Sequence, residues 1–387
     1  MAAQRGAPFA ARLVAWQRVH GRHDLPWQRT RDPYRVWLSE IMLQQTQVAA
    51  ALPYYERFLA RFPDVRTLAA ATRDDVLAHW SGLGYYRRAH HLHEAARAVV
   101  EHHQGAFPAD PQALAALPGI GRSTAAAIAT FAFGTRAAIL DGNVKRVLAR
   151  HRGIDGFPGA PAVERQLWQA AEALLPDADV EAYTQGLMDL GATVCVRASP
   201  RCLLCPVAGD CLARREGRID ALPAPRPARA VPRRDVQLLV CELEGRLLLE
   251  RRPARGVWAG LWSLPELPLG EDAAAFVQAS LGVRPARSEA MAPVEHAFTH
   301  FTLTMHPVRL PLVDAPDHAP AERRWFGRKH ALGLGLPAPV RRLIAGLDAP
   351  VAGPAVAPRR QRGGAGTRAT PAAHGRSAGG RRSSASG

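Results

Sequence analysis

Four cysteines lie within seventeen residues and have the spacing C-x6-C-x2-C-x5-C: Cys195, Cys202, Cys205 and Cys211. Thiolates this close in sequence converge on one soft centre, which is either a tetrahedral zinc ion or an iron–sulfur cluster. Zinc sites usually contain two short C-x2–4-C pairs, whereas this stretch has only one. The spacing therefore favours one [4Fe–4S] cluster held by a loop at 195–211, with zinc as the alternative.

A disulfide framework is a second alternative for these cysteines. The chain opens with no apolar secretory segment, and a fifth cysteine, Cys241, leaves an odd number of thiols. Both observations favour reduced thiols over disulfides. Cys241 lies in an apolar run, 236–241, and is expected to be a buried strand residue.

Composition sets limits on the class of protein. The chain has 387 residues, of which 47% are hydrophobic, so it is long enough for two domains with hydrophobic cores. No apolar window approaches the roughly 20 residues of a membrane helix, so we expect a cytoplasmic protein with no membrane contact. The formal net charge of +16 suggests a polyanionic partner such as nucleic acid.

The periodicity of apolar residues divides the chain into four stretches. Residues 1–215 show the three- and four-residue spacing of helices and are expected to form an all-α domain. A proline-rich linker, 216–232, follows, and residues 233–348 mix short strand-like runs with two helical runs, at 273–281 and 337–347, as in an α+β domain. The tail, 349–387, contains seven arginines, no acidic residue and no apolar periodicity, and is expected to be disordered.

The segment L-P-G-I-G-R-S-T, residues 117–124, precedes an alanine-rich helical run at 125–132. Gly119 and Gly121 turn the chain just before a helix begins, and the bare amides of such a turn attract a phosphate group without reading base sequence. A Gly-x-Gly turn more often only ends a helix. Within L-P-G-I-G it indicates a helix-hairpin-helix motif that binds the DNA backbone.

Two carboxylates are candidates for catalysis. Glu40 lies in W-L-S-E-I-M-L, on a predicted helix that we extend over 33–47, and its apolar neighbours are expected to raise its pKa so that it holds a proton near neutrality. Asp141 follows an apolar run and precedes Gly142. Each has a simpler interpretation, since Glu40 would otherwise face solvent and Asp141 would otherwise only cap the helix that begins near Val144.

Taken together, these motifs closely resemble the bacterial MutY-type adenine DNA glycosylases over about residues 9–347. W-L-S-E-I-M-L-Q-Q-T-Q, G-L-G-Y-Y-R-R-A, L-P-G-I-G-R-S-T, L-D-G-N-V-K-R-V and the cysteine loop occur in the order found in that family. The resemblance implies base-excision repair of double-stranded DNA that contains adenine opposite 8-oxoguanine or guanine. It also implies a monomer in the nucleoid; it identifies no protein partner.

The resemblance assigns roles to three residues of the catalytic domain. Glu40 would protonate N7 of adenine, ionised Asp141 would stabilise or attack the electron-poor sugar, and Asn143 would hold Asp141 in place. Water would complete the hydrolysis. The adenine must first be flipped out of the duplex to reach these groups.

Two further residues bear on the reaction type. Related endonuclease III-type lyases hold a Schiff-base lysine at the position of Ser123, and a serine cannot form that bond, so a monofunctional hydrolase is expected. Lys145 lies near Asp141 in sequence; we favour a phosphate contact for it over weak trapping of an abasic product.

Several residues would open the duplex and fill the gap. Gln44, Gln45 and Gln47 follow Glu40, and Tyr85 lies in the segment that resembles the family's intercalating loop, where an aromatic ring replaces lost stacking. Tyr86 is equally consistent with a DNA contact and with packing at a helix start.

Residues 233–347 resemble the Nudix-like domain of this family. The acidic positions of a true Nudix hydrolase are occupied here by Phe276, Ala279 and Ser280, and its arginine position by Ala275, so magnesium-dependent hydrolysis is not expected. The domain is instead expected to recognise 8-oxoguanine through one loop: Phe298, Thr299 and His300.

This chain departs from the family at two positions. Thr299 replaces a serine and keeps its hydroxyl, while Gln28 stands where many members have arginine. Two rival interpretations remain. One is an endonuclease III-like lyase, against which Ser123 and the second domain argue, and the other is a DNA-damage binder without catalysis, against which the two carboxylates argue.

Overall fold

A computed structural model describes residues 8–227, 230–316 and 322–347. The predicted tail, 349–387, and the last residue of the predicted second domain, Asp348, lie outside the described residues. Contacts between Cα atoms gather Met1–Leu347 into one compact unit. The predicted domain boundaries are therefore not tested by this grouping and remain predictions.

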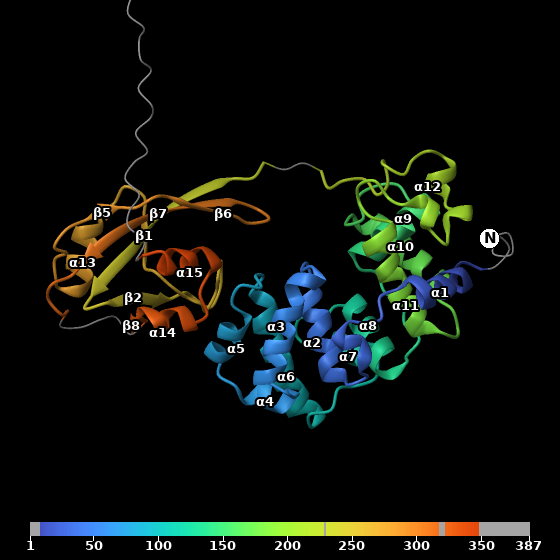
Figure 1. Cartoon of the computed structure of the whole chain (residues 1–387), viewed down its shortest axis with the longest axis horizontal. Helices are drawn as coiled ribbons and strands as arrows, with labels where there is room; N and C mark the ends of the chain where they lie inside the picture. The colour runs from blue at the N-terminus through green and yellow to red at the C-terminus, as the bar shows by residue number, and fades with distance from the viewer. Residues whose placement is uncertain (1–7, 228–229, 317–321, 348–387) are drawn as a thin grey trace, which may run out of the picture. The chain divides into compact units, whose positions relative to one another are not determined.

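The first half of the chain is helical, as predicted (Figure 1). Short 3-10 or π turns occur at Pro26–Arg29, Leu190–Val194, Cys202–Leu204 and Ala208–Asp210. The α-helices are α1 (Phe9–His20), α2 (Pro33–Leu43), α3 (Val48–Arg61), α4 (Val65–Ala70), α5 (Arg73–Trp80), α6 (Arg87–His103), α7 (Pro111–Ala115), α8 (Arg122–Phe133), α9 (Gly142–Arg152), α10 (Pro161–Leu174), α11 (Val180–Asp189) and α12 (Leu212–Arg215).

Helix α2 illustrates how local sequence sets an element that carries the site. Asp32 caps its N-terminus by accepting a hydrogen bond of 3.0 Å from the Tyr34 amide, and Pro33 occupies the first turn, where a missing N–H costs nothing. Trp37 and Leu38 are fully buried on its inner face. The helix ends at Leu43, so the prediction of a helix through residue 47 was wrong.

Two hydrophobic cores support the helical half. One contains α2, α3, α5, α6 and parts of α8, and the other joins α1 with α8, α9, α10 and α11. Helix α8 contributes Ile128 to the first core and Ala127 to the second. Because α8 is shared, it fixes the position of α2, which packs against it, relative to α11.

The second half is built around one mixed sheet. Its long strands β1 and β7 pair in parallel over ten residues, and the other described pairings are antiparallel. The strands are β1 (Arg233–Leu243), β2 (Arg246–Arg251), β3 (Trp262–Ser263), β4 (Glu266–Pro268), β5 (Glu289–Ala290), β6 (Val294–Ala297), β7 (Thr302–Pro311) and β8 (Arg323–Gly327); the helices are α13 (Ala273–Leu281), α14 (Arg328–Gly333) and α15 (Ala338–Ala345).

Side chains of β1 alternate between two cores, as the twofold period of a strand requires. Leu238 and Val240 join the core that contains α15, whereas Leu239 and Cys241 join a smaller core against α13. The sheet is therefore buried on both faces. The burial of Cys241 confirms its prediction as a buried strand residue.

Element type was predicted more accurately than element ends. The helix predicted at 273–281 has those bounds, while the one predicted at 337–347 is the shorter α15. The proline-rich stretch 216–232 contains no helix or strand in its described residues. Proline removes the amide donors that either element needs.

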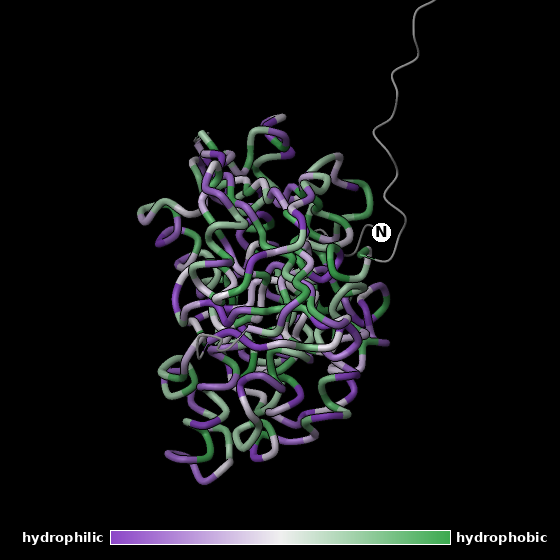
Figure 2. Tube along the Cα trace, turned by 90° about the vertical axis from the view of Figure 1, so that its left-hand side faces the viewer, coloured by the Kyte–Doolittle hydropathy of each residue, from purple (hydrophilic) through white to green (hydrophobic). Residues whose placement is uncertain are grey.

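The core that holds α2 and α6 continues into the second half. It includes Leu77 and Trp80 of α5 together with Leu336, just before α15, and Val340 within α15. Figure 2 shows short hydrophobic and hydrophilic segments alternating along the chain, and no helix in the described residues is long and apolar enough to cross a membrane.

Candidate active site

The two predicted carboxylates come together in the structure. Glu40 lies on the last turn of α2, and Asp141 occupies the N-cap of α9, where its Oδ1 accepts a 2.7 Å hydrogen bond from the Val144 amide. The two lie close enough for the charge of Asp141 to affect the ionisation of Glu40. The capping interpretation of Asp141 is correct, and it places this carboxylate beside Glu40.

Burial and the neighbouring Asp141 charge raise the pKa of Glu40 to about 8. Glu40 therefore keeps its proton at neutral pH. Burial also raises the pKa of Asp141, but hydrogen bonds from Val144 and Asn143 and the positive charge of Arg146 oppose that rise. Of the two carboxylates, Asp141 is the one whose contacts stabilise the charged form, so it suits the charged partner and Glu40 suits the acid of such a pair.

Asn143 lies within the first turn of α9 and connects Asp141 to the cysteine loop. Its side chain hydrogen-bonds Asp141, and its Oδ1 accepts a 2.8 Å hydrogen bond from Arg146 Nη2. Arg146 also donates to the carbonyl oxygens of Gly191 and Cys195, both at 2.7 Å. A Cβ at Gly191 would lie 2.5 Å from the Asn143 Cβ, so this close approach requires glycine.

A pocket with a volume of about 470 Å³ opens beside Glu40. Its walls include Trp27, Leu43 and Met188 together with the amide side chains of Gln28 and Gln185. The volume is sufficient for a purine base, and the aromatic and aliphatic walls suit a flat ring.

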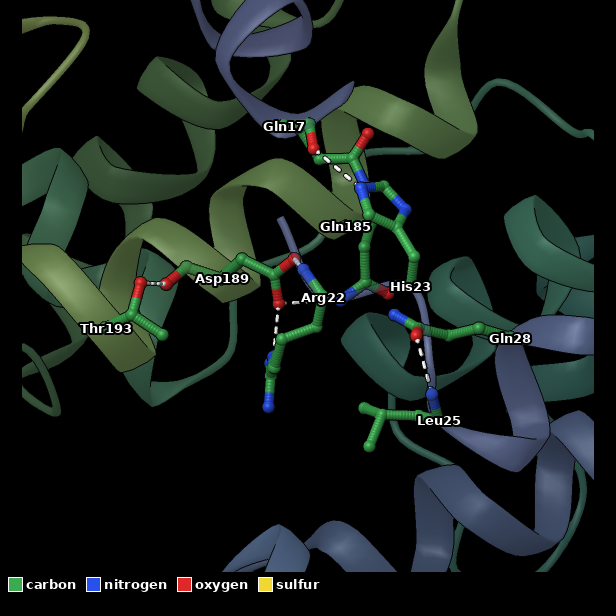
Figure 3. A network of polar contacts seen from close by, with 8 residues as sticks. All are labelled: Gln17, Arg22, His23, Leu25, Gln28, Gln185, Asp189 and Thr193. Atoms are coloured by element: carbon green, nitrogen blue, oxygen red, sulfur yellow. Dashed lines mark hydrogen bonds and ion pairs between the residues drawn. The ribbon is translucent and has the colours of Figure 1, made fainter. Parts of the chain in front are cut away.

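The side-chain amide of each glutamine already makes one hydrogen bond within the protein (Figure 3). Gln185 Nε2 donates to Asp189 Oδ1 at 2.8 Å, and Gln28 Oε1 accepts from the Leu25 amide at 3.2 Å. A carboxylate accepts only and an amide N–H donates only, so neither side chain can be flipped. Gln185 Oε1 therefore remains available as an acceptor, and Gln28 Nε2 remains available as a donor.

Asp189 organises this wall. It is fully buried and accepts from the Arg22 amide at 2.9 Å, from Arg22 Nε at 2.6 Å and from Gln185, while Thr193 Oγ1 donates to its backbone oxygen at 2.8 Å. Figure 3 shows this network beside the contact of His23 with the Gln17 carbonyl. Sequence reasoning noted Gln28 only as a departure and missed Gln185, Asp189 and Arg22.

The helix-hairpin-helix residues adopt the expected turn. Gly119 has a φ of 76°, and a Cβ there would lie 2.6 Å from the Cβ of His91, whereas Gly121, the N-cap of α8, faces open space. The Ser123 hydroxyl accepts a 2.8 Å hydrogen bond from the Leu140 amide, directly before Asp141. Lys145 Nζ lies 2.6 Å from Glu164 Oε1, so its ammonium already has an acidic partner.

A larger groove, about 1410 Å³ in volume, brings together most of the predicted DNA-opening and lesion-reading residues. Of those predicted, Gln47 does not line it and is the N-cap of α3. The groove also contains residues that sequence reasoning did not select, among them Arg234, Trp258 and His296. The predicted residues that line it are Gln44, Gln45, Tyr85, Phe298, Thr299 and His300.

Adjacent tyrosines in the wall of this groove have opposite environments. Tyr85 is 49% exposed, whereas Tyr86 is 8% exposed and its hydroxyl donates to the Leu336 carbonyl at 3.0 Å. Tyr86 is therefore a packing residue, and Tyr85 is available to a ligand. On the facing turn, Phe298 stacks on Phe301 at 4.5 Å between ring centroids.

The four predicted metal ligands line one small cavity: Cys195, Cys202, Cys205 and Cys211. All four are free thiols, so the disulfide alternative does not apply. Burial, together with the neighbouring thiols, raises the pKa of Cys205 to about 12. Within the described residues, no three potential ligands converge on a single metal-ion position, although these thiols share one cavity.

The former acidic positions of the Nudix motif carry no metal site. Phe276 packs against the small core of β1 and α13, with the Arg323 guanidinium 5.5 Å from its ring centroid. Ala275 and Ala279 are exposed and have no ligand atoms. That this half does not hydrolyse nucleotides remains a prediction.

Comparison with known proteins gives two family matches and several full-length relatives. Residues 38–173 match the HhH-GPD superfamily of base excision DNA repair proteins, and residues 236–346 match the NUDIX domain. The adenine DNA glycosylase of Buchnera aphidicola subsp. Acyrthosiphon pisum is 34% identical over 338 residues, which cover 87% of this chain and 96% of that protein.

Two further relatives carry the same name. The adenine DNA glycosylase of Mus musculus is 36% identical over 379 residues, covering 82% of this chain and 73% of the mouse protein. That of Mycolicibacterium smegmatis is 40% identical over 222 residues, covering 57% of this chain and 73% of the relative.

Proposed function

The chain belongs to the adenine DNA glycosylase family of base-excision repair, and we propose that it hydrolyses the N-glycosidic bond of adenine mispaired with 8-oxoguanine or guanine. The substrate would be double-stranded DNA, and the strand would not be cut. The observation that carries the proposal is the pairing of Glu40, whose pKa is raised to about 8, with Asp141 at the N-cap of α9. The proposal requires Glu40 to hold a proton and Asp141 to carry a negative charge at the same pH.

The reaction breaks the bond between N9 of adenine and C1′ of the sugar. Protonated Glu40 donates its proton to N7, so the base leaves as neutral adenine, and the bonding electrons go to the departing base. Ionised Asp141 stabilises the positive charge that develops on the sugar. Water then adds to C1′ and loses a proton, which leaves an abasic site and returns the carboxylates to their starting state.

The pocket beside Glu40 is complementary to adenine. The exocyclic amine of adenine is a donor and suits the free Oε1 of Gln185, while a ring nitrogen is an acceptor and suits the free Nε2 of Gln28. Guanine carries an oxygen in place of the amine and would meet the Gln185 acceptor with a second acceptor. The two amides therefore favour adenine over guanine.

The environment of two residues supports hydrolysis without strand cleavage. Ser123 provides a hydroxyl, which already accepts the Leu140 amide and cannot form a Schiff base. Lys145 Nζ lies 2.6 Å from Glu164 Oε1, so this nitrogen is held in an ion pair and is not free to attack the sugar. The pairing also means that a phosphate contact by Lys145 would have to displace or share this partner.

The groove supports recognition of the base opposite adenine. Tyr85 is 49% exposed, and it lines the same groove as the Phe298–His300 turn. 8-Oxoguanine has an N7–H donor where guanine has an N7 acceptor. The Thr299 hydroxyl can accept a hydrogen bond from this N7–H. Gln44, Gln45 and Gln47 lie at or beside the turn after α2, where they would contact the opened duplex; Gly119 and Gly121 would contact the backbone.

We further propose that the four-cysteine loop holds one [4Fe–4S] cluster. The donor set fits, because four free thiols line one cavity and their sequence contains only one of the two short C-x2–4-C pairs that zinc sites usually have. When bound, the cluster would supply a structural centre for residues 195–211. Iron content and a visible charge-transfer band in anaerobically purified protein test this assignment, and a zinc-only preparation would overturn it.

We also expect a monomer that works in the cytoplasm on nucleoid DNA, since the relatives named above are DNA glycosylases and the charge of +16 favours a polyanion.

The deciding experiment is single-turnover cleavage of a duplex with adenine opposite 8-oxoguanine, assayed with and without alkali. Base loss that requires alkali to break the strand supports the monofunctional assignment. Strand cutting without alkali would favour the lyase alternative. Tight binding with no base loss from cluster-loaded protein would favour a damage binder.

A further inference from the structure

The loop Ser81–Tyr86 presents one tyrosine to the groove and buries the next. Its backbone is left-handed at Gly82, Gly84 and Tyr85, with φ values of 102°, 78° and 49°. A tyrosine in this region is uncommon and persists only where the surrounding structure enforces it. The orientation of Tyr85 therefore depends on whatever holds this loop.

On one side, Arg88 holds the loop to the helical half. Its Nη2 donates to the Gly84 carbonyl at 3.1 Å, and its Nη1 donates to the carbonyls of Met42 and Gln44, both at 2.7 Å. Arg88 thereby joins the Tyr85 loop to the turn that carries Gln44 and Gln45. These groove residues form one rigid edge.

On the other side, a closed set of hydrogen bonds joins the loop to the strand-containing half. Tyr86 and Ser81 donate their hydroxyls to the same Leu336 carbonyl, at 3.0 Å and 2.9 Å. Each hydroxyl also accepts: Tyr86 from the Gly82 amide at 3.2 Å, and Ser81 from Arg341 Nη2 at 2.9 Å. We call Ser81, Tyr86, Leu336 and Arg341 the hydroxyl clasp.

The clasp leads to the opposite edge of the groove. Leu336 and Arg341 flank the start of α15, and α15 packs against β6, which leads into the Phe298–His300 turn. A second attachment lies nearby, where His90 Nε2 contacts the Ala259 carbonyl at 2.9 Å beside Trp258. Trp258 in turn packs on Phe298, with ring centroids 5.2 Å apart.

We propose that the Tyr86 hydroxyl is a positioning group: through the hydroxyl clasp it sets the separation of Tyr85 from the Phe298–His300 turn, and so sets the preference for 8-oxoguanine over guanine opposite adenine. This inference rests on the proposed function. It assigns Tyr86 no contact with DNA, since its side chain is 8% exposed and its hydroxyl is held by the Leu336 carbonyl and the Gly82 amide.

Tyr86→Phe is the direct test, because it keeps the buried ring and removes only the hydroxyl. The Gly82 amide loses its acceptor, and Leu336 keeps only Ser81 as a donor. A lost buried hydrogen bond corresponds to about a three- to tenfold change in an equilibrium. We expect the ratio of single-turnover rates, adenine opposite 8-oxoguanine over adenine opposite guanine, to fall by about that factor.

Tyr34→Phe is the matched control. Tyr34 is 4% exposed and donates its hydroxyl to the Phe62 carbonyl at 2.6 Å, within the helical half and away from the groove. Both substitutions remove one buried tyrosine hydroxyl and should lower the melting temperature by a similar amount. Only Tyr86→Phe is expected to change the rate ratio, which a purely structural role would leave intact.

Ser81→Ala provides a second test, since it removes the other donor to Leu336 without altering an aromatic ring. It should lower the same ratio, and it decides the matter if Tyr86→Phe does not fold. A double-mutant cycle with Thr299→Val sharpens the result: the effect of Tyr86→Phe should shrink once the Thr299 hydroxyl is gone, because both act on one recognition step.

The outcomes separate this inference from the function on which it rests. A wild-type protein that releases no adenine opposite either base would contradict the proposed function. Equal wild-type rates opposite 8-oxoguanine and guanine would overturn the inference alone, since there would be no preference for the clasp to set. A wild-type protein with a clear preference that Tyr86→Phe and Ser81→Ala both retain would overturn the role of the clasp alone. Equal loss of the ratio in Tyr34→Phe would show a general stability effect and would also overturn it.

Discussion

The pocket beside Glu40 and the groove beside Tyr85 differ in how their walls are held. The pocket encloses about 470 Å³, and two polar side chains of its wall, Arg22 and Gln185, are joined through the buried Asp189. The groove encloses about 1410 Å³ and is lined by aromatic rings from both halves, on loops with left-handed backbone. The pocket fixes donors and acceptors, whereas the groove fixes the spacing between two edges.

This difference predicts two kinds of mutational effect. A substitution in the pocket removes a group that acts on the departing base, so it should change the rate for every mispair. A substitution in the groove alters how the opposite base is held, so it should change the preference between mispairs and affect the rate less. Four experiments test this separation.

The largest effect is expected for Glu40→Gln. The amide cannot donate a proton to N7 as an acid does, and loss of a general acid typically costs about 10²- to 10⁴-fold in rate. Single-turnover adenine release should fall by that factor opposite 8-oxoguanine and guanine alike, while binding is retained. Glu56→Gln, at an exposed carboxylate on α3, serves as the control, and comparable rates for the two variants would remove Glu40 from the acid role.

The pH dependence of adenine release should follow the two carboxylates. Since burial and Asp141 raise the pKa of Glu40 to about 8, its proton is present below that pH and is lost above it. The rate should be level near neutrality and fall about tenfold per pH unit above 8. It should also fall at acidic pH, where Asp141, whose pKa burial raises, becomes neutral.

Glu40→Gln provides the control for this profile. If the alkaline limb reflects Glu40, the residual activity of the variant should lose that limb and keep the acidic one. An unchanged alkaline limb in the variant would assign it to another group.

A smaller effect is expected for Gln185→Met, which keeps the length of the side chain and removes its acceptor. Loss of one hydrogen bond to the adenine amine should slow release about tenfold, equally for both mispairs. Thr193→Val disturbs the same Asp189 without lining the pocket and should stay within about twofold of wild type. Similar losses in both variants would point to the Asp189 network as a whole.

The smallest effect is expected for Thr299→Val, which removes the hydroxyl and keeps the branched shape. Release of adenine opposite 8-oxoguanine should slow about three- to fivefold, and release opposite guanine should change less. Thr304→Val on β7, which does not line the groove, is the control. Equal slowing of adenine release opposite both bases would show that the groove changes the rate for every mispair, as the pocket does. The proposed difference between pocket and groove would then be wrong.

The separate parts of the site could be predicted from the sequence where a short motif sets local geometry. Asp141 precedes Gly142 and Asn143, and this order produces a capped helix that holds the carboxylate by its own first-turn amides. The cysteine spacing likewise predicted four thiols around one cavity. Their assigned roles remain predictions, because geometry alone does not test chemistry.

What could not be predicted depends on contacts between distant segments. The free end of Gln185 is set by Asp189, which Arg22 holds across 167 positions of the chain. No local pattern encodes that choice. The ten-residue parallel pairing of β1 with β7 and the burial of Tyr86 under Leu336 are likewise properties of the assembled core.

Phe276 occupies a position at which a metal-binding carboxylate would now destabilise the fold. Where a nucleotide hydrolase would keep a carboxylate for magnesium, this chain has built an aromatic ring into the core between β1 and α13, beneath the Arg323 guanidinium. A glutamate restored at that position would leave a gap in the core and place a charge at its edge before any second ligand existed. Replacing Phe276 alone would therefore weaken the fold.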